Sequence, residues 1–474
     1  MNPMHIPILR YGKPYRSLNT AEVTHIQTGE PMACVSQANR GLVAKDLQEI
    51  APARESLERF NVSELVEICR KAGDLFMSES LDYDGEAQSP EEYVGQLSGT
   101  TGMPESLCRG NMGKIHLVCV EMAEILGGLT RGLDLSVLDG QGRGQKLSYL
   151  RQTDALGAVL PSNSPGVHSL WVPAIPLKVP LVLKPGGEEP WTPFRIARAF
   201  VEAGCPPEAF CYYPTDHSGA AEILMRCGRS LLFGGGATVV AWETDPRVQL
   251  HGPGRSKVIF GEDQAASWDD HLEVIVTSAV HNGGRSCINV SGVWTPRSGR
   301  EIGEGLAARL AQITPRGLDD PEAQIAAFTR PALAEQLSAM IDSQLKVPGA
   351  VDLTAEIRGT DRVAELDGLT FLNPTVIYCE DSDHPLANTE FLFPFVSVVE
   401  IRREDLLEKI GPTLALTALT EDAGFIEELL SSPNVERLNV GPIPTMKISW
   451  DQPHEGNLFE HLYRQRALQW AQGA

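Results

Sequence analysis

Leu156-Gly157-Ala158-Val159-Leu160-Pro161-Ser162-Asn163-Ser164-Pro165 opens the stretch of sequence that decides the fold. Its first five residues are apolar and predict a buried strand, and the prolines and serines that follow predict the turn that ends it. A second apolar strand is expected at residues 181–183, before Lys184-Pro185-Gly186-Gly187, and a helix at residues 192–203. A strand, a polar turn and a helix therefore follow one another in this stretch.

The same order continues toward the C-terminus. A strand is expected at residues 210–213, a helix at 218–227 and a strand at 230–233, which runs into Gly234-Gly235-Gly236. Strands that alternate with helices at this spacing are joined by right-handed crossovers, so the sequence predicts an α/β fold with a parallel sheet. Ligands of such sheets bind beyond the carboxyl ends of the strands.

Two of these strand ends carry candidate nucleotide contacts. Glycines before a helix let its first N–H groups approach a pyrophosphate, which makes Gly234, Gly235 and Gly236 candidates for a cofactor site. The alternative for this triplet is a plain turn. Lys184 is a candidate to hydrogen-bond a ribose or a phosphate, and the alternative is a solvated lysine.

A second decisive stretch is His281-Asn282-Gly283-Gly284-Arg285-Ser286-Cys287-Ile288-Asn289-Val290. Apolar segments flank it: residues 272–280 predict a buried helix or strand, and residues 290–294 alternate like a strand. Cys287 would sit on a tight turn that the glycines permit, with an arginine close in sequence, which is a setting that nucleophilic cysteines favour. The alternative is an inert buried thiol.

Composition limits the class of protein. The chain has 474 residues, 42% hydrophobic and 22% charged, which fits a globular protein of two or three domains. A formal net charge of -22 argues against nucleic-acid and membrane partners, which require basic surfaces. Nine cysteines without a C-x-x-C pair argue against a disulfide framework and against a metal site, and favour a reducing compartment. Without a signal core or an apolar span in the sequence, we expect a cytoplasmic protein.

Weaker patterns predict further local elements. They are a hairpin around residues 28–29, a helix at 64–80 capped by Ser63, a turn at 98–104, a helix at 114–129, a hairpin tip or mobile connection at 140–146, and the end of a helix at 464–468.

Five motifs resemble those of the aldehyde dehydrogenase superfamily, in the family's order. Residues 161–165 resemble Pro-Trp-Asn-Phe-Pro, residues 182–193 resemble Leu-Lys-Pro-x-x-x-x-Pro-x-Thr, residues 201–207 resemble Glu-Ala-Gly-x-Pro, residues 282–287 resemble Asn-x-Gly-Gln-x-Cys, and residues 388–394 resemble Glu-x-Phe-Gly-Pro. The set spans about 230 residues, and its order makes it specific although no single motif is.

The resemblance implies an aldehyde-dehydrogenase-like α/β fold in three parts. A Rossmann-like NAD(P)-binding domain would comprise residues 1–131 and 152–245, and an α/β catalytic domain residues 246–438. An oligomerisation hairpin and tail would comprise residues 132–151 and 439–474. The resemblance also implies a homodimer or homotetramer.

The same resemblance assigns roles to four residues. Cys287 would be the nucleophile that carries a thioester intermediate, and the Asn163 side chain with the Cys287 backbone N–H would form the oxyanion hole. Lys184 would hold the adenine ribose of NAD or NADP, and Glu390 the nicotinamide ribose. The substrate would be a small aldehyde or an acyl thioester.

One departure concerns the fate of the thioester. Hydrolytic members carry a base glutamate in Leu-Glu-Leu-Gly-Gly-Lys, whereas this chain has Leu250-His251-Gly252-Pro253-Gly254-Arg255. Members without the glutamate are typically CoA-acylating, so we expect coenzyme A as a co-substrate. One alternative is a hydrolytic enzyme with His251 as the base, which its ordinary pKa suits. Others are a histidine without a chemical role and a family fold kept as a non-catalytic scaffold.

Further departures concern the cofactor and the substrate. Gly187 stands where an acidic residue beside the adenine ribose is expected, which makes NADP acceptable. Gly236 stands where Ser or Thr is usual at the helix start. The resemblance places Ser164, His168 and Trp171 on the wall of the substrate tunnel.

Overall fold

The computed structural model describes residues 3–83, 85–140 and 146–471, and the expected hairpin tip at 140–146 lies almost wholly outside them. The chain forms two compact units. Unit 1 comprises Met1–Thr100, Cys108–Gly252 and Ser449–Ala474, and unit 2 comprises Thr101–Leu107 and Pro253–Ile448. The three-part division remains a prediction.

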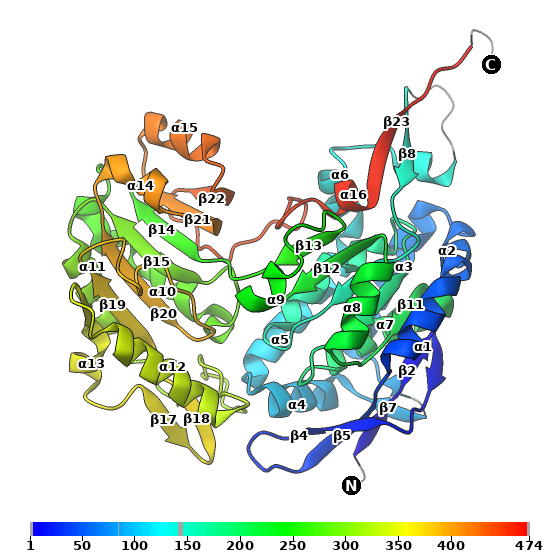
Figure 1. Ribbon diagram of the computed structural model, residues 1–474, viewed down its shortest axis with the longest axis horizontal. Coiled ribbons are helices and arrows are strands. Elements are labelled where there is room, and N and C mark those ends of the chain that lie inside the picture. Colours follow the sequence, from blue (N-terminus) through cyan, green and yellow to red (C-terminus); the bar gives the residue numbers. More distant parts are fainter. Residues whose placement is uncertain (1–2, 84, 141–145, 472–474) are drawn as a thin grey trace. The chain divides into compact units, whose positions relative to one another are not determined.

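Unit 1 is built on a seven-stranded sheet with the order β13-β12-β9-β10-β11-β2-β3 (Figure 1). The strands from β13 to β11 are parallel, and β2 and β3 add antiparallel pairs at one edge. Their bounds are β2 Ile8–Arg10, β3 Lys13–Tyr15, β9 Leu156–Val159, β10 Leu181–Lys184, β11 Phe210–Tyr212, β12 Arg229–Phe233 and β13 Val248–His251. The predicted parallel sheet of an α/β fold is therefore confirmed.

The strand order contains a switch point. The chain runs from β9 outward through β10 and β11 on one side, and then returns to add β12 and β13 on the other side of β9. In an open α/β sheet a crevice forms at such a point, outside the carboxyl ends of the strands. The ends of β10 and β12 are the strand ends at which the sequence predicts nucleotide contacts, and Asn163 follows the end of β9.

Helices cover this sheet because their apolar faces need burial. α7 (Trp191–Glu202) and α8 (His217–Arg226) connect the strands, α3 (Val62–Ser78) packs on α7, and α1 (Arg40–Asp46) packs on α8 (Figure 1). Further helices are α2 Ala51–Glu58, α4 Pro90–Thr101, α5 Glu105–Val120, α6 Met122–Leu129, α9 Gly236–Val240 and α16 Leu458–Leu462.

Small sheets complete unit 1. β4 (Thr20–Thr24) and β5 (Pro31–Ser36) form the hairpin expected around residues 28–29, and β1 (Met4–Ile6) pairs with β5. β8 (Leu147–Arg151) pairs antiparallel with β23 (Tyr463–Ala467). β6 (Leu81–Tyr83) pairs with β7 (Glu86–Gln88).

Four local predictions are wrong in detail. α3 begins at Val62 because Asn61, and not Ser63, accepts the Glu64 N–H while Glu64 caps the Asn61 N–H. Residues 98–101 continue α4 and are not a turn, and the helix expected at 114–129 is divided into α5 and α6 at Glu121. Residues 463–467 form a strand because their backbone pairs with β8, which overrides local helical periodicity.

Unit 2 is built on a second seven-stranded sheet with the order β16-β19-β20-β15-β14-β21-β22, parallel except for β16 (Figure 1). Its strands are β14 Ser256–Phe260, β15 Val290–Thr295, β16 Ala350–Asp352, β19 Thr375–Cys379, β20 Phe395–Glu400, β21 Thr413–Leu419 and β22 Val435–Val440. Its helices are α10 Leu272–Val280, α11 Gly299–Leu310, α12 Pro331–Gln344, α13 Leu353–Arg358, α14 Arg403–Lys409 and α15 Ala423–Ser431. β17 (Val363–Leu366) and β18 (Leu369–Leu372) form a separate hairpin.

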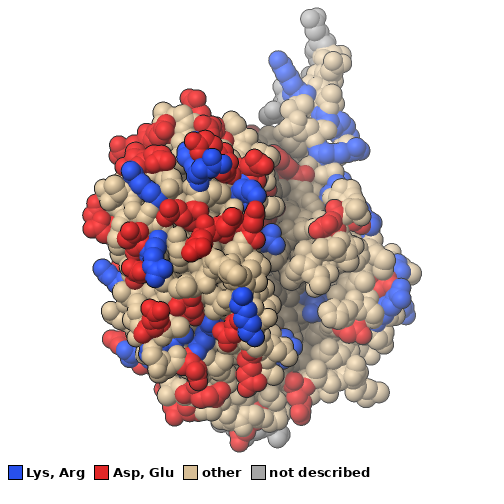
Figure 2. Space-filling model, turned by 60° about the vertical axis from the view of Figure 1, so that its left-hand side comes forward, with Lys and Arg blue, Asp and Glu red and all other residues tan. Residues whose placement is uncertain are grey.

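Acidic side chains are spread over the face shown in Figure 2, interrupted by single lysines and arginines. This distribution agrees with the net charge of -22. Within the described residues, no helix combines the length and the apolar character that a membrane crossing requires.

Candidate active site

The loop around Cys287 is a tightly wound turn in unit 2, between α10 and β15. Asn282, Gly283 and Gly284 have φ values of 52°, 68° and 71°, so three consecutive residues are left-handed. A Cβ atom on Gly284 would lie 2.4 Å from the Pro394 nitrogen, which leaves room only for glycine. Asn282 can adopt this conformation because asparagine tolerates the left-handed region better than most residues with a side chain.

Asn289 fixes the loop onto the end of α10. Its Oδ1 accepts a 2.8 Å hydrogen bond from the Ser286 N–H, and its Nδ2 donates to the carbonyls of Ser278 and His281 at 2.9 Å. The Asn282 amide adds a 2.9 Å bond to the Ser286 hydroxyl. The backbone on the N-terminal side of Cys287 is thus held by side chains of its own loop.

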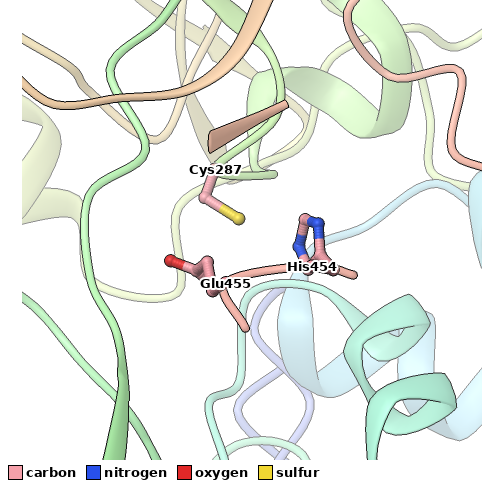
Figure 3. Close-up of side chains that lie close together, drawn as sticks. All are labelled: Cys287, His454 and Glu455. Carbon is pink, nitrogen blue, oxygen red and sulfur yellow. The ribbon is translucent and has the colours of Figure 1, made fainter. Parts of the chain in front are cut away.

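Cys287 is one of two half-buried cysteines; the other is Cys34, and the remaining seven are buried. Its carbonyl accepts a 2.8 Å bond from the Ser256 hydroxyl, and Figure 3 shows its sulfur at the end of the side chain. Burial raises the pKa of Cys119 and of Cys379 to about 12. These two thiols stay protonated at neutral pH and do not compete as nucleophiles.

Arg285 has a structural role. Its guanidinium donates a 2.6 Å bond to the carbonyl of Thr101 and a second bond to that of Ala327, and it lies over the Phe328 ring. The side chain is only 7% exposed. The guanidinium therefore ties the Cys287 loop to two other segments of unit 2.

The carboxylate of Glu390 is held by the backbone N–H of Arg255, which has a φ of 44°. The Lys257 amine supports the same peptide by donating to the Arg255 carbonyl at 2.8 Å and to the Thr413 hydroxyl at 3.0 Å. Burial, with a smaller effect of the Arg255 charge, lowers the pKa of Lys257 to about 7. Neither sequence pattern nor resemblance singled out Lys257.

The switch point of the unit 1 sheet fits a dinucleotide. Lys184 ends β10, beside β9, and Cβ atoms added to Gly235 or Gly236 would meet no atom within 4 Å. The backbone there is open to close approach by a ligand, as pyrophosphate binding requires. Burial lowers the pKa of Lys184, while Glu188 and Asp216 oppose that shift. The space beside Gly234 is filled by the Thr238 side chain, since a Cβ atom on Gly234 would lie 2.9 Å from it.

The backbone of Gly187 is also accessible to a ligand, and the neighbouring acidic residue, Glu188, is hydrogen-bonded within unit 1. A Cβ on Gly187 would meet no atom within 4 Å, whereas the Glu188 carboxylate accepts a 2.8 Å hydrogen bond from the Ser162 hydroxyl. Glu188 is therefore tied to the loop that follows β9. Asn163, the next residue of that loop, is half-buried.

His168 and Trp171 form a buried hydrogen-bonded chain. Trp171 Nε1 donates to His168 Nδ1 at 3.1 Å, and His168 Nε2 lies 3.0 Å from the Glu189 carboxylate. Both rings have no exposed surface, and Ser164 is 7% exposed. Their place on a substrate tunnel remains a prediction.

His251 lies at the end of β13 in unit 1, where it is 5% exposed. Its ring is stacked on that of Phe233 with centroids 4.3 Å apart and planes inclined by 13°. Its Nδ1 contacts the carboxylate of Glu455. Sequence reasoning did not find Glu455, because 204 residues separate the pair and no motif marks the tail.

A cavity of about 40 Å³ borders His251 and is lined also by Gln249, His454 and Gly456. It is large enough for a water molecule, and its lining offers polar partners. His454 and Glu455, labelled in Figure 3, are consecutive residues of the C-terminal segment.

A doubly wound parallel sheet with a switch point is the architecture on which many α/β proteins bind nucleotides. The sequence profile described as "Aldehyde dehydrogenase family" matches residues 15–410. The chain belongs to the aldehyde dehydrogenase family, and it is therefore an oxidoreductase that acts on aldehydes.

Relatives of assigned activity are distant. The chain is 21% identical over 396 residues to a 5-carboxymethyl-2-hydroxymuconate semialdehyde dehydrogenase from Escherichia coli, which covers 80% of each chain. It is 24% identical over 267 residues to a geranial dehydrogenase from Castellaniella defragrans. That match covers 53% of this chain and spans about half, 52%, of the relative.

Solved structures agree with the fold. An aldehyde dehydrogenase from Bacillus cereus, determined as an NAD+ complex, superposes with a TM-score of 0.76 at 16% identity, over 98% of this chain and 96% of the other. The likeness extends over both units. The expected aldehyde-dehydrogenase-like fold is thus confirmed.

Proposed function

We propose that the protein oxidises a small aldehyde to a carboxylic acid with NAD or NADP, through a thioester on Cys287 and with His251 as the base that activates water. The observation that carries this proposal is the contact of the His251 ring with the Glu455 carboxylate. A buried imidazole that is oriented by a carboxylate is the usual arrangement of a catalytic base.

Cys287 performs the covalent steps. Its thiolate adds to the carbonyl carbon, forming a C–S bond, and the Asn163 amide and the Cys287 N–H stabilise the negative oxygen. Bound NAD(P)+ would supply the hydride acceptor that converts this adduct into a thioester. The side chains of Asn289 and Ser256 hold the backbone around Cys287, which supports its role as the nucleophile.

His251 performs the proton transfer. Its ring takes a proton from water, the water oxygen adds to the thioester carbon, and the C–S bond breaks with its electron pair returning to sulfur. In sum, one aldehyde, one water and one NAD(P)+ give one carboxylic acid, one NAD(P)H and one proton. The cavity beside His251 supports the proposal, since it has room for water.

Cofactor binding is assigned to Lys184 and Glu390 on the family resemblance. The open backbone at Gly187, Gly235 and Gly236 supports this assignment. Without an acidic side chain at position 187, a ribose 2′-phosphate meets no carboxylate there, so NADP is acceptable beside NAD. We propose a cytoplasmic homodimer or homotetramer, on the free thiols and the family resemblance.

A CoA-acylating function is the second candidate. It rests on the missing glutamate and on Gly252-Pro253-Gly254, which resembles acylating members. In that case the free thiol of coenzyme A, and not water, would attack the thioester. The His251–Glu455 pair would then have no assigned role.

The test is an assay of the purified protein with a panel of aldehydes, NAD or NADP, with and without coenzyme A. Acid and reduced cofactor formed without coenzyme A, and abolished by Cys287→Ala, support the proposal. Turnover that requires coenzyme A supports the second candidate. If no aldehyde reacts and no cofactor binds, the protein is a scaffold and both functions are wrong.

A further inference from the structure

We propose that Glu455, from the C-terminal segment, is a positioning residue that orients and polarises His251. The inference rests on the proposed function and deepens it, because it makes the tail of the chain part of the base. It departs from the resemblance, which assigns residues 439–474 to oligomerisation alone.

The His251 ring is fixed on two sides. Phe233, its neighbour in the register of β12 and β13, stacks against one face with ring centroids 4.3 Å apart, and the Glu455 carboxylate contacts Nδ1. Stacking restricts the tilt of the ring, and the carboxylate selects its rotation about χ2. The two contacts together leave the imidazole one orientation.

The contact also selects the tautomer. A carboxylate at Nδ1 favours a proton on that nitrogen, which leaves the lone pair on Nε2. The amide nitrogen of Gln249 lies 3.5 Å from Nε2, so the neighbouring group is a donor and agrees with an accepting Nε2. Nε2 is thus the atom assigned to take the proton from water.

Backbone strain at Glu455 supports a functional role. Glu455 has a φ of 51° and Gly456 a φ of 107°, so the carboxylate is presented from a left-handed turn. Left-handed conformations are costly for residues with a Cβ and persist where the surroundings enforce them. The Glu455 carbonyl accepts a hydrogen bond from the Gln249 side chain, which lies on the same strand as His251.

The segment is anchored on both sides of Glu455. On one side, Gly128 admits the Asp451 backbone, since a Cβ there would lie 2.2 Å from its carbonyl oxygen. On the other, Asn457 donates to the Leu129 carbonyl at 2.8 Å and Arg229 to the His461 carbonyl at 2.9 Å. These contacts within unit 1 hold Glu455 against β13.

Other titratable groups of unit 1 lie around the ring. His454 lines the cavity beside His251. Arg229, at the start of β12, donates to the backbone carbonyl of His461 in the C-terminal segment. Burial, aided by the Arg229 charge, lowers the pKa of His461 to about 4, so His461 is neutral near neutral pH. Glu455 is the anion in contact with the ring, so removing its charge should slow proton transfer to His251.

The experiment compares three variants of the full-length protein with an aldehyde that the wild type turns over. Glu455→Gln keeps the shape and removes the charge, and Glu455→Asp keeps the charge on a shorter side chain. Glu460→Gln is the control, because Glu460 is an exposed carboxylate on the same segment. Steady-state acid formation and the first-turnover yield of reduced cofactor are measured for each.

Glu455→Gln should lower steady-state acid formation on the order of 10²-fold, which is the contribution of a well-placed base. First-turnover hydride transfer should stay within about twofold, so that a burst of one reduced cofactor per site appears. Glu455→Asp should recover part of the rate, and Glu460→Gln should match the wild type.

A wild-type rate of acid formation for Glu455→Gln would overturn the inference and leave the proposed function standing. A wild type that forms no acid without coenzyme A overturns the proposed function and the inference together, and it is recognised without any variant. If Glu455→Gln unfolds at a lower temperature than the wild type, the Glu455→Asp variant is used for the test instead. A smaller slowing of acid formation with an intact burst then supports the inference. An unchanged rate overturns it.

Discussion

The hydroxyl of Ser256, on β14, donates a 2.8 Å hydrogen bond to the backbone carbonyl of Cys287, in the loop that leads into β15. The Ser256 hydroxyl oxygen also accepts a 3.2 Å bond from the Ala415 N–H on β21. One buried side chain thus joins β14 and β21 to the loop that carries the nucleophile. The position of the thiol is set by the sheet as well as by its loop.

Ser256→Ala should therefore affect catalysis as well as stability. It leaves the Cys287 carbonyl and the Ala415 N–H without this partner, which costs about 1–3 kcal/mol of unfolding free energy. Ser397→Ala is the matched control, because this buried serine on β20 donates to the Ala387 carbonyl at 2.9 Å. We expect similar losses of stability in denaturant titrations, and a fall in kcat for Ser256→Ala alone. Equal kcat values would contradict the role assigned to Ser256.

Gly284→Ala should destabilise unit 2 strongly. The new Cβ would lie 2.4 Å from the Pro394 nitrogen, a backbone atom, and the φ of 71° is unfavourable for alanine. Gly359→Ala separates the two effects, since Gly359 has a φ of 65° but no atom within 4 Å of the added Cβ. The control should lose about 1 kcal/mol and Gly284→Ala at least twice as much, measured by thermal unfolding. Equal losses of stability in the two variants would show that the Cys287 loop relaxes around the added Cβ atom without a further cost in free energy.

Sequence reasoning located the elements whose signals are local. Residues 156–233 alternate between apolar strands and helices with clear ends, and the structure confirms each of these elements within about one residue. The Cys287 loop was found for the same reason, because its glycines lie next to the cysteine. What the sequence did not contain is the pairing partner of a segment: residues 463–467 have helical periodicity but become a strand on β8.

The same limit applies to the site. Glu455 contacts His251 across 204 residues, and Lys257 supports the Glu390 loop through a backbone carbonyl, which no side-chain motif encodes. Arg285 was noted as a cation beside the thiol, yet its guanidinium binds the carbonyls of Thr101 and Ala327. Residue type suggested a charge effect, and only the packing revealed a structural one.

Lys184→Met should raise the KM for the cofactor with little change in kcat, because the proposed contact is made in the ground state and the transition state alike. Burial lowers the pKa of Lys184, so the amine loses its charge at lower pH than an exposed lysine does. In the wild type, the KM should accordingly rise as the pH becomes alkaline, and more for NADP than for NAD if the amine faces the 2′-phosphate. A KM equal in wild type and variant would contradict the assignment of Lys184.

Lys257→Met should change how stability depends on pH. Burial lowers the pKa of the folded-state amine from 10.5 to about 7, so between these values the unfolded chain binds the proton and the folded protein does not. Stability of the wild type therefore gains from this group as the pH rises from about 7 toward 10, by up to about 4 kcal/mol, and below pH 7 that gain is absent.

The variant lacks the titrating amine, so the free energy of unfolding of the wild type minus that of Lys257→Met should increase steadily over this range. Denaturant titrations at pH 7, 8.5 and 10 measure the difference, and the hydrogen bonds lost to the Arg255 carbonyl and the Thr413 hydroxyl shift all three values alike. Lys13→Met, which replaces an exposed lysine, is the control and should not reproduce this increase. A flat difference for Lys257→Met would show that the amine stays protonated, with the Glu390 carboxylate compensating its charge.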